Sequence, residues 1–205
     1  MNKYDLAGKK INVFLDELGS SSVSPGGGAA AALTGALGAS LLEMTARINS
    51  VREKKKLNKT GISKEASSRI RKFASIKKEL SGIVRKDTEA FLALSAFPKE
   101  KRSGPGYDKA LVRAAAAPLT ICRLAAEALE LGRAEVSRTG AWLASDLAEA
   151  GLLLEAAFYS GKLNVEINLK YIQDPETAAS MRADVASMEA EVAGNAKELA
   201  GALKP

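Results

Sequence analysis

The sequence predicts an all-α fold, a single-domain up-and-down bundle of long helices. Three observations predict it. Apolar residues recur three and four positions apart, as in Ile70, Phe73 and Ile76, which is the spacing of one helix face. Alanine is abundant while only 5% of the residues are aromatic, and no segment is rich in strand-forming residues. The 205 residues fit one domain over positions 1–205 with a sizeable core.

The expected helices follow from this spacing and from capping, glycine and proline signals. They span about Ile11 to Leu18, Gly27 to Ser50, Ser63 to Pro98, Tyr107 to Leu131, Trp142 to Ser160 and Asp174 to Leu203. The charged run 52–56 is expected to break the second helix as a solvated turn, and Pro118 to kink or interrupt the fourth. Residues 163–169 alternate β-branched and polar residues but have no partner strand, so we expect a helix or a turn.

Composition narrows the chemistry. The formal net charge of +6 favours an anionic partner, either nucleic acid or a polyanionic small molecule. Nucleic acid is not expected, because the basic residues are not interleaved with aromatics and no recognition motif appears. The absence of histidine excludes histidine bases, triads and zinc ligands. Acid–base chemistry must then use Asp, Glu, Lys, Tyr or water, since the single Cys122 is expected to be a buried structural thiol.

Targeting signals are not expected. Residues Met1 to Asp5 lack the apolar core of a signal peptide, and no run is expected to be long and apolar enough to cross a bilayer. We therefore expect a cytoplasmic protein with no membrane partner, and we expect no metal.

The glycine-rich stretch Ser20–Gly28, followed by the alanine-rich Ala29–Gly38, organises the functional hypothesis. Glycine has no Cβ and proline no N–H, so the stretch predicts an irregular loop at a helix N-terminus. Free N–H groups at such a terminus favour anions. We therefore expect the backbone of Pro25, Gly26, Gly27 and Gly28 to approach a ligand. The alternative is a linker leading into a buried helix.

Several short motifs occur in a familiar order. They are Ser24–Ala31 with Gly35–Ala39 and Met44, then Asp87-Thr88-Glu89-Ala90-Phe91, Pro118-Leu119, Ser145-Asp146, and Leu163-Asn164-Val165-Glu166-Ile167-Asn168. In order and spacing, essentially the whole chain resembles the formimidoyltetrahydrofolate cyclodeaminase and methenyltetrahydrofolate cyclohydrolase family.

The resemblance implies an all-helical protein that binds a folate and is usually a homodimer with its site near the interface. Cyclodeaminases close 5-formiminotetrahydrofolate to 5,10-methenyltetrahydrofolate and release ammonia. Cyclohydrolases open the methenyl bridge with water to give 10-formyltetrahydrofolate. Both reactions pass through a tetrahedral carbon between two nitrogens, and the residues do not separate them.

Two aspartates are the catalytic candidates, because a carboxylate can stabilise a methenyl cation and accept a proton from water. Asp146 is the first candidate for the catalytic carboxylate, because it lies in an otherwise apolar segment. Glu149 and Glu155 in the same segment are alternative candidates for this role. Asp87 comes second. The alternatives are that Asp146 caps a helix or pairs with an arginine, and that Asp87, after Arg85-Lys86, forms an exposed ion pair.

The substrate-binding candidates supply amides and cations. Asn164 and Asn168 share one helix face, and their carboxamides suit a pterin edge, although they could instead cap helix ends. Lys54, Lys55 and Lys56 resemble a lysine run of the family and would meet the glutamate carboxylates of the folate by charge. Arg47 stands where the family commonly has asparagine, and we count it with the binding residues.

Other positions depart from the family pattern. Trp142 stands where an asparagine is frequent, and Ala114–Ala117 replace the usual threonine and aspartate. Together with Arg47, these changes leave open an alternative function: a diverged, catalytically inactive protein that binds a folate or another anion on the same scaffold.

Overall fold

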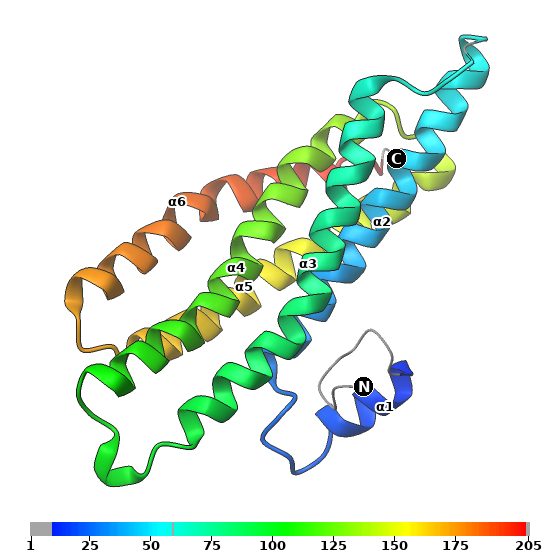
Figure 1. Ribbon diagram of the computed structural model, residues 1–205. Coiled ribbons are helices and arrows are strands. Elements are labelled where there is room, and N and C mark those ends of the chain that lie inside the picture. Colours follow the sequence, from blue (N-terminus) through cyan, green and yellow to red (C-terminus); the bar gives the residue numbers. More distant parts are fainter. Residues whose placement is uncertain (1–9, 59, 204–205) are drawn as a thin grey trace.

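The protein is a bundle of antiparallel helices (Figure 1). The computed structural model describes residues 10–58 and 60–203. Consecutive long helices run in alternating directions, and the described residues contain no strand. The elements are α1 (Ile11–Leu18), α2 (Gly27–Lys56), α3 (Lys64–Ser95), α4 (Pro105–Val136), α5 (Ala144–Leu169) and α6 (Pro175–Ala200), with short 3-10 helices η2 (Lys99–Lys101) and η3 (Ala141–Leu143). The prediction of an all-α up-and-down bundle is therefore confirmed.

The structure decides three local expectations. The charged run does not break α2, which continues to Lys56 and ends with Lys54–Lys56 in its last turn, where cations favour the helix dipole. Residues 163–169 belong to α5, as one of the two expected alternatives. α4 runs through the buried Pro118 without interruption, so the expected discontinuity is wrong. Ser63 caps α3, accepting a hydrogen bond from the backbone N–H of Ala66.

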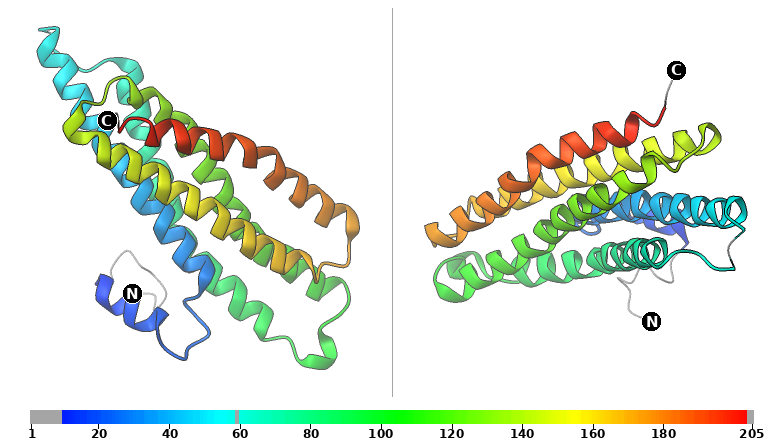
Figure 2. Two further views of the ribbon diagram at one scale, coloured as in Figure 1. Left: turned by 180° about the vertical axis from the view of Figure 1, so that it is seen from behind. Right: turned by 90° about the horizontal axis from the view of Figure 1, so that it is seen from above.

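Small residues let α2 and α5 approach closely. A Cβ added to Gly38 of α2 would lie 2.7 Å from Leu154 Cγ and 3.1 Å from the Ala150 carbonyl oxygen of α5. One added to Gly35 would lie 3.2 Å from Ala157 Cβ. The two helices therefore pack almost backbone to backbone, and they lie side by side when the molecule is seen from behind (Figure 2, left).

α2 corrects one further expectation. By length and composition alone it is apolar enough to cross a membrane, because its alanine-rich half raises the mean hydropathy. Most of that apolar stretch, 61%, is buried inside the bundle, against α3, α4 and α5. The same composition is typical of the central helix of a packed bundle, so it is weak evidence that α2 crosses a membrane.

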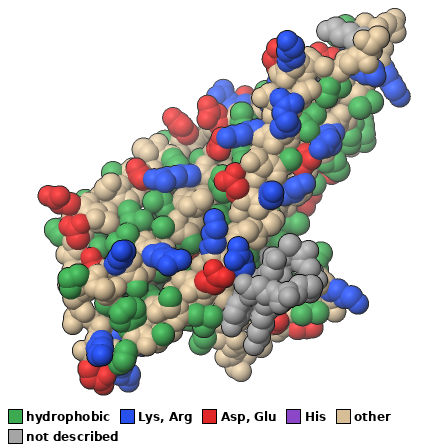
Figure 3. Space-filling view, in the orientation of Figure 1, with side chains coloured by type: hydrophobic (Ala, Val, Ile, Leu, Met, Phe, Trp, Pro, Cys, Tyr) green, Lys and Arg blue, Asp and Glu red, His purple; other side chains and the backbone are tan. Residues whose placement is uncertain are grey.

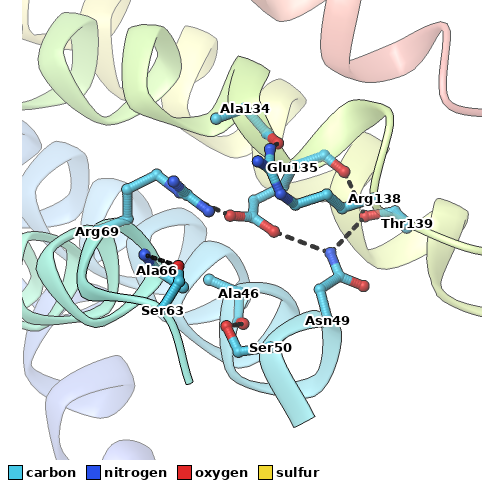
Figure 4. A network of polar contacts seen from close by, with 10 residues as sticks. All are labelled: Ala46, Asn49, Ser50, Ser63, Ala66, Arg69, Ala134, Glu135, Arg138 and Thr139. Atoms are coloured by element: carbon cyan, nitrogen blue, oxygen red, sulfur yellow. Dashed lines mark hydrogen bonds and ion pairs between the residues drawn. The ribbon is translucent and has the colours of Figure 1, made fainter. Parts of the chain in front are cut away.

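A buried ion pair joins α2, α3 and α4 at one end of the bundle (Figure 4). Glu135 is 1% exposed. Its Oε1 accepts a hydrogen bond from Arg69 Nε at 2.9 Å, and its Oε2 accepts one from Asn49 Nδ2 at 2.9 Å. Asn49 Nδ2 also donates to Thr139 Oγ1 at 2.9 Å. A buried carboxylate needs such partners, so this network fixes the register of the three helices.

Cys122 is buried where α4 crosses α5, as expected of a structural thiol. A Cβ added to Gly161 would lie 2.9 Å from its Sγ. Burial raises the pKa of the thiol to about 12, so it stays protonated and unreactive near neutral pH.

Candidate functional site

The main cavity lies beyond the N-terminal end of α2, because the neighbouring helices extend past that end. Asp87 of α3 lies against the first turn of α2. From Asp87, α3 continues for eight more residues, which at the rise of an α-helix is about 12 Å. The first turns of α4 and the last turns of α5 also line the space. The start of α2 forms its floor. The cavity has a volume of about 670 Å³, a size typical of small-molecule sites.

The serine-rich loop before α2 is tied down on the cavity side. Ser24 Oγ donates a hydrogen bond to Thr88 Oγ1 of α3 at 3.0 Å, and Thr88 Oγ1 donates to the Val84 carbonyl oxygen. Ser22 Oγ donates to the Ser24 carbonyl oxygen at 2.8 Å. The polar loop residues therefore hold the chain that enters α2 against α3.

The floor offers backbone donors. Gly26 is the N-cap of α2 and supplies no side-chain cap, so the first N–H groups of the helix have no acceptor within it. Gly26, Gly27 and Gly28 all line the cavity, as predicted, whereas Pro25 stands between lining residues without lining it. The glycine-rich stretch is thus a helix start that faces a cavity, and its contact with a ligand stays a prediction.

Asp87 lies directly on Gly28. A Cβ added to Gly28 would lie 2.4 Å from Asp87 Oδ1 and 2.6 Å from its Cγ, so this contact requires glycine. Among the described residues the Asp87 carboxyl has no hydrogen-bond or ion-pair partner. Burial raises its pKa above the usual value of an aspartate, because desolvation disfavours the charged form. An aspartate in this state, facing a cavity, is suited to take up and return a proton.

Asn164 and Asn168 are placed by α5 on the same cavity wall. Asn164 Nδ2 donates to the Ser160 carbonyl oxygen at 2.8 Å, and Asn168 Nδ2 donates to the Asn164 carbonyl oxygen at 2.7 Å. These bonds fix the two carboxamides on the helix while each keeps an oxygen acceptor and a second N–H for a ligand. The carboxamide of Asn164 also lies over Gly27, 3.6 Å from a Cβ added there. The helix-capping alternative is wrong, since α5 runs through both residues.

The remaining walls are apolar and aromatic, and the sequence argument missed them. They comprise Phe91 and Leu94 of α3, Tyr107 and Leu111 of α4, and Ile167 with Tyr171 near the end of α5. Tyr107 packs edge-on against Phe97, with ring centroids 5.3 Å apart. One signal was present: Phe91, Ile167 and Tyr171 are large apolar or aromatic side chains that the bundle leaves partly exposed.

The structure divides the predicted site residues into two sets. Gly26–Gly28, Asp87, Asn164 and Asn168 meet at the cavity. The others lie toward the opposite end of the bundle: Asp146 in the first turn of α5, and Arg47 and Lys54–Lys56 in the second half of α2. From Gly27 to Lys54 the helix rise amounts to about 40 Å, and from Asp146 to Asn164 about 27 Å.

Arg47 has a local partner instead. Its Nη2 lies 2.6 Å from Glu43 Oε1, and Lys77 Nζ lies 2.6 Å from Glu43 Oε2. Burial raises the pKa of Glu43, but the two cations outweigh it and hold that pKa below its usual value. Trp142 is also remote from the cavity and lies beneath Arg52, whose Cζ is 5.7 Å from the ring centroid. Two of the departures from the family pattern therefore leave the cavity untouched, while Ala114 lines it.

Among residues 10–58 and 60–203, no group of three or more Cys, Asp or Glu side chains lies close enough to hold a metal ion. The polar groups at the cavity are one carboxyl, one guanidinium, two carboxamides, the hydroxyls of Ser24, Tyr107 and Tyr171, and the backbone N–H groups of a helix start. The fold and this cavity define a helical protein with a cavity of small-molecule size, in which a buried carboxyl lies beside two carboxamides.

Comparison with known proteins agrees. The sequence model of the family described as Formiminotransferase-cyclodeaminase matches residues 10–187, and the chain belongs to that family. It is 32% identical over 172 residues to a methenyltetrahydrofolate cyclohydrolase of Methylorubrum extorquens, covering 80% of this chain and 81% of the relative. It is 29% identical over 188 residues to the formimidoyltransferase-cyclodeaminase of Sus scrofa, covering 87% of this chain but 34% of that longer protein.

A solved structure has the same fold. The crystal structure of formiminotetrahydrofolate cyclodeaminase from Thermotoga maritima superposes with a TM-score of 0.85 at 26% sequence identity, covering 96% of each chain. The resemblance stated from the short motifs is thereby confirmed over nearly the whole chain.

Proposed function

We propose that this chain is a folate one-carbon enzyme that acts on the carbon between N5 and N10 of tetrahydrofolate. The observation that carries the proposal is the buried Asp87 carboxyl, which lies on the glycine floor of the cavity opposite two fixed carboxamides. The relatives with a similar chain length are a cyclohydrolase and a cyclodeaminase, and both reactions need one group that accepts and returns a proton.

In the cyclohydrolase reaction, Asp87 acts on water. The carboxylate stabilises the cationic methenyl bridge and accepts a proton as the water oxygen bonds to the bridge carbon. The resulting tetrahedral carbon then loses its bond to N5. The Asp87 carboxyl returns a proton to N5, the hydroxyl proton passes to solvent, and the products are 10-formyltetrahydrofolate and one proton.

In the cyclodeaminase reaction, the same group moves a proton between two nitrogens. The formimino group enters protonated, as an amidinium cation. N10 bonds to its carbon, which leaves an amino group on the tetrahedral carbon, and N10 gives up its proton to Asp87. The Asp87 carboxyl then protonates the departing amino group, the carbon–nitrogen bond breaks, and ammonia leaves the methenyl product. Asn164 and Asn168 hydrogen-bond the pterin edge in both reactions and hold the reacting carbon over Asp87.

One absorbance assay tests the proposal and separates the two activities. A cyclohydrolase consumes the methenyl species, and a cyclodeaminase forms it from the formimino substrate. We expect the wild-type chain to catalyse one of these reactions and Asp87→Asn to lose it, since positioned acid–base groups contribute about 10²–10⁴-fold. The cyclohydrolase arm is tested first, because the relative with 32% identity carries that activity in its name.

A wild-type protein that binds folate but catalyses neither reaction would instead support an inactive binding protein on this scaffold. Ala114, which lines the cavity where the family commonly has a polar residue, is the observation that keeps this second function open.

We propose further that the chain forms a homodimer through α2 and α5. The face formed by α3, α4 and α6 carries mixed charges (Figure 3). On α5, by contrast, large apolar residues stay exposed at helical spacing, and Leu37 and Val51 of α2 are exposed as well. The residues are Leu152, Tyr159, Leu163 (72% exposed) and Ile167 of α5, with Tyr171 (61% exposed) just beyond its end. An exposed apolar stripe of this length is typical of a protein interface.

Light scattering tests the dimer. Leu163→Glu is expected to give a monomer, because it places a charge at the most exposed position of the stripe; a wild-type monomer contradicts the proposal. An antiparallel pairing of α5 helices would bring the start of one α5, with Asp146, toward the partner's cavity. Asp146→Asn therefore tests its predicted catalytic role: loss of activity in an intact dimer supports that role, and full activity rules it out.

A further inference from the structure

The proposed folate site has a second charged side chain, at the end of the cavity away from its floor. Arg102 belongs to the loop between α3 and α4 and lines the cavity. Among the described lining residues it carries the only positive charge, as Asp87 carries the only carboxyl group. A cation at this place was not anticipated from the sequence, where the glutamate-binding role fell to Lys54–Lys56.

Asp87 and Arg102 lie at opposite ends of the cavity. α3 runs about 12 Å from Asp87 to its end at Ser95, and the loop that carries Arg102 follows. No ion pair joins the two side chains, and burial, without a contribution from a described cation, accounts for the raised pKa of Asp87. The cavity therefore has a deep proton-transfer end and a cationic outer end.

The space between the two ends is apolar and aromatic. Phe91 and Leu94 come from α3, Tyr107 from α4 and Ile167 from α5. In order from the floor, the cavity offers hydrogen-bonding groups, then flat apolar walls, then a guanidinium. A folate has the same sequence of parts: a polar pterin, a benzoyl ring and a glutamate with two carboxylates.

The loop holds Arg102 in a defined place. Arg102 Nε donates a hydrogen bond to the Phe97 carbonyl oxygen at 3.2 Å, and the Phe97 ring packs against Tyr107 of α4. This leaves the terminal nitrogens of the guanidinium for a ligand. The neighbouring Lys99 and Lys101 outnumber Glu100, so the loop that carries Arg102 has a net positive charge. A planar guanidinium matches a carboxylate with two parallel hydrogen bonds.

We propose that Arg102 binds a carboxylate of the folate's glutamate tail and makes the site selective for folates that carry this tail. The inference rests on the proposed function, since it assumes that a folate occupies the cavity with its pterin on Asp87 and the glycine floor. Lys54–Lys56 then have no part in binding the tail within the same chain.

The test compares ligands with and without glutamate. Binding of 5-formyltetrahydrofolate, and of the matching 5-formyltetrahydropteroate that lacks glutamate, is measured by calorimetry for the wild type and for Arg102→Gln. We expect Arg102→Gln to weaken binding of the glutamate-bearing ligand about tenfold, as expected for one charge-assisted hydrogen bond at a partly exposed site. Binding of the pteroate is expected to stay within about twofold, because the two ligands share every other contact.

Lys101→Gln is the matched control, since it removes the same charge one residue away without touching the cavity. It is expected to leave the preference between the two ligands unchanged. Arg102→Lys, which keeps the charge but not the planar fork, should recover part of the affinity. Equal weakening for both ligands, or no weakening, overturns the role of Arg102 while leaving the folate site intact. A wild-type chain that binds neither ligand overturns the proposed function itself.

Discussion

Replacing Gly28 by alanine tests the contact on which the proposed chemistry depends. The added Cβ would lie 2.4–2.6 Å from all three atoms of the Asp87 carboxyl group. Carbon and oxygen atoms in contact need about 3.4 Å or more, so the carboxyl must move by about 1 Å. A displacement of this size in a catalytic group costs about 100-fold in rate. Stability should fall by at most about 2.5 kcal/mol, since an overpacking cost of about 1–3 kcal/mol is partly offset by the helix preference of alanine, about 0.5–1 kcal/mol.

The assay is kcat/KM from methenyl absorbance, with circular dichroism to confirm the fold. Gly82→Ala is the control: Gly82 lies on α3 near Asp87, but a Cβ added there meets nothing within 4 Å. This control is expected to be fully active and slightly more stable. If Gly28→Ala kept wild-type activity while folded, Asp87 would not be held by Gly28 in the working enzyme, and the reasoning about this site would be refuted.

Three further predictions follow from charge and burial. Burial raises the pKa of Asp87, so the folded chain holds this proton to a higher pH than the unfolded chain does, and stability is lost as pH rises through the folded pKa. Asp87→Asn should therefore raise the Tm at pH 8 but not at a pH below the usual pKa of an aspartate. An unchanged Tm at pH 8 contradicts this prediction. Arg69→Met leaves the buried Glu135 without its cation and should lower the free energy of unfolding by about 3 kcal/mol, a Tm loss of roughly 6–12 °C. Arg123→Met breaks an exposed ion pair and should cost less than about 1 kcal/mol. Equal Tm losses for the two variants would show that burial does not determine how much each ion pair contributes to stability. Asn164→Ala should raise KM about tenfold, since it removes hydrogen bonds worth about 1 kcal/mol each without touching Asp87, and a lower kcat with an unchanged KM would place Asn164 in the chemistry instead.

Local patterns predicted the helices because each pattern acts within a few residues. The spacing of Ile70, Phe73 and Ile76 defines a buried face of α3, and Ser63 caps that helix through its own backbone. The end of α2 was misjudged, because by composition the charged run 52–56 is typical of a turn. In the structure the run is helical and mostly exposed, and Lys54–Lys56 lie in the last turn of α2, where cations favour the helix dipole.

The candidate site was predictable only where its residue types are unusual. Three successive glycines before an alanine-rich helix indicated a close approach, and Asn164 and Asn168 share a face whatever they contact. The sequence ranked Asp146 before Asp87, whereas Asp87 is the aspartate that lines the cavity within one chain, because an apolar sequence neighbourhood says nothing about which end of a long helix lies at the cavity. Arg102 and the aromatic walls come from several different elements, which only the folded chain brings together.

By itself the sequence determined an all-helical bundle, the helix start with free N–H groups, and the need to run acid–base chemistry without histidine. Each of these follows from backbone geometry and residue type, which the chain carries locally. Tertiary structure determined that the neighbouring helices extend past the start of α2. It thereby determined where the cavity lies and which carboxyl group is buried in it. That choice rests on contacts between residues about 60 to 140 positions apart, such as Gly28 with Asp87 and Gly27 with Asn164, and no local pattern encodes such a pairing.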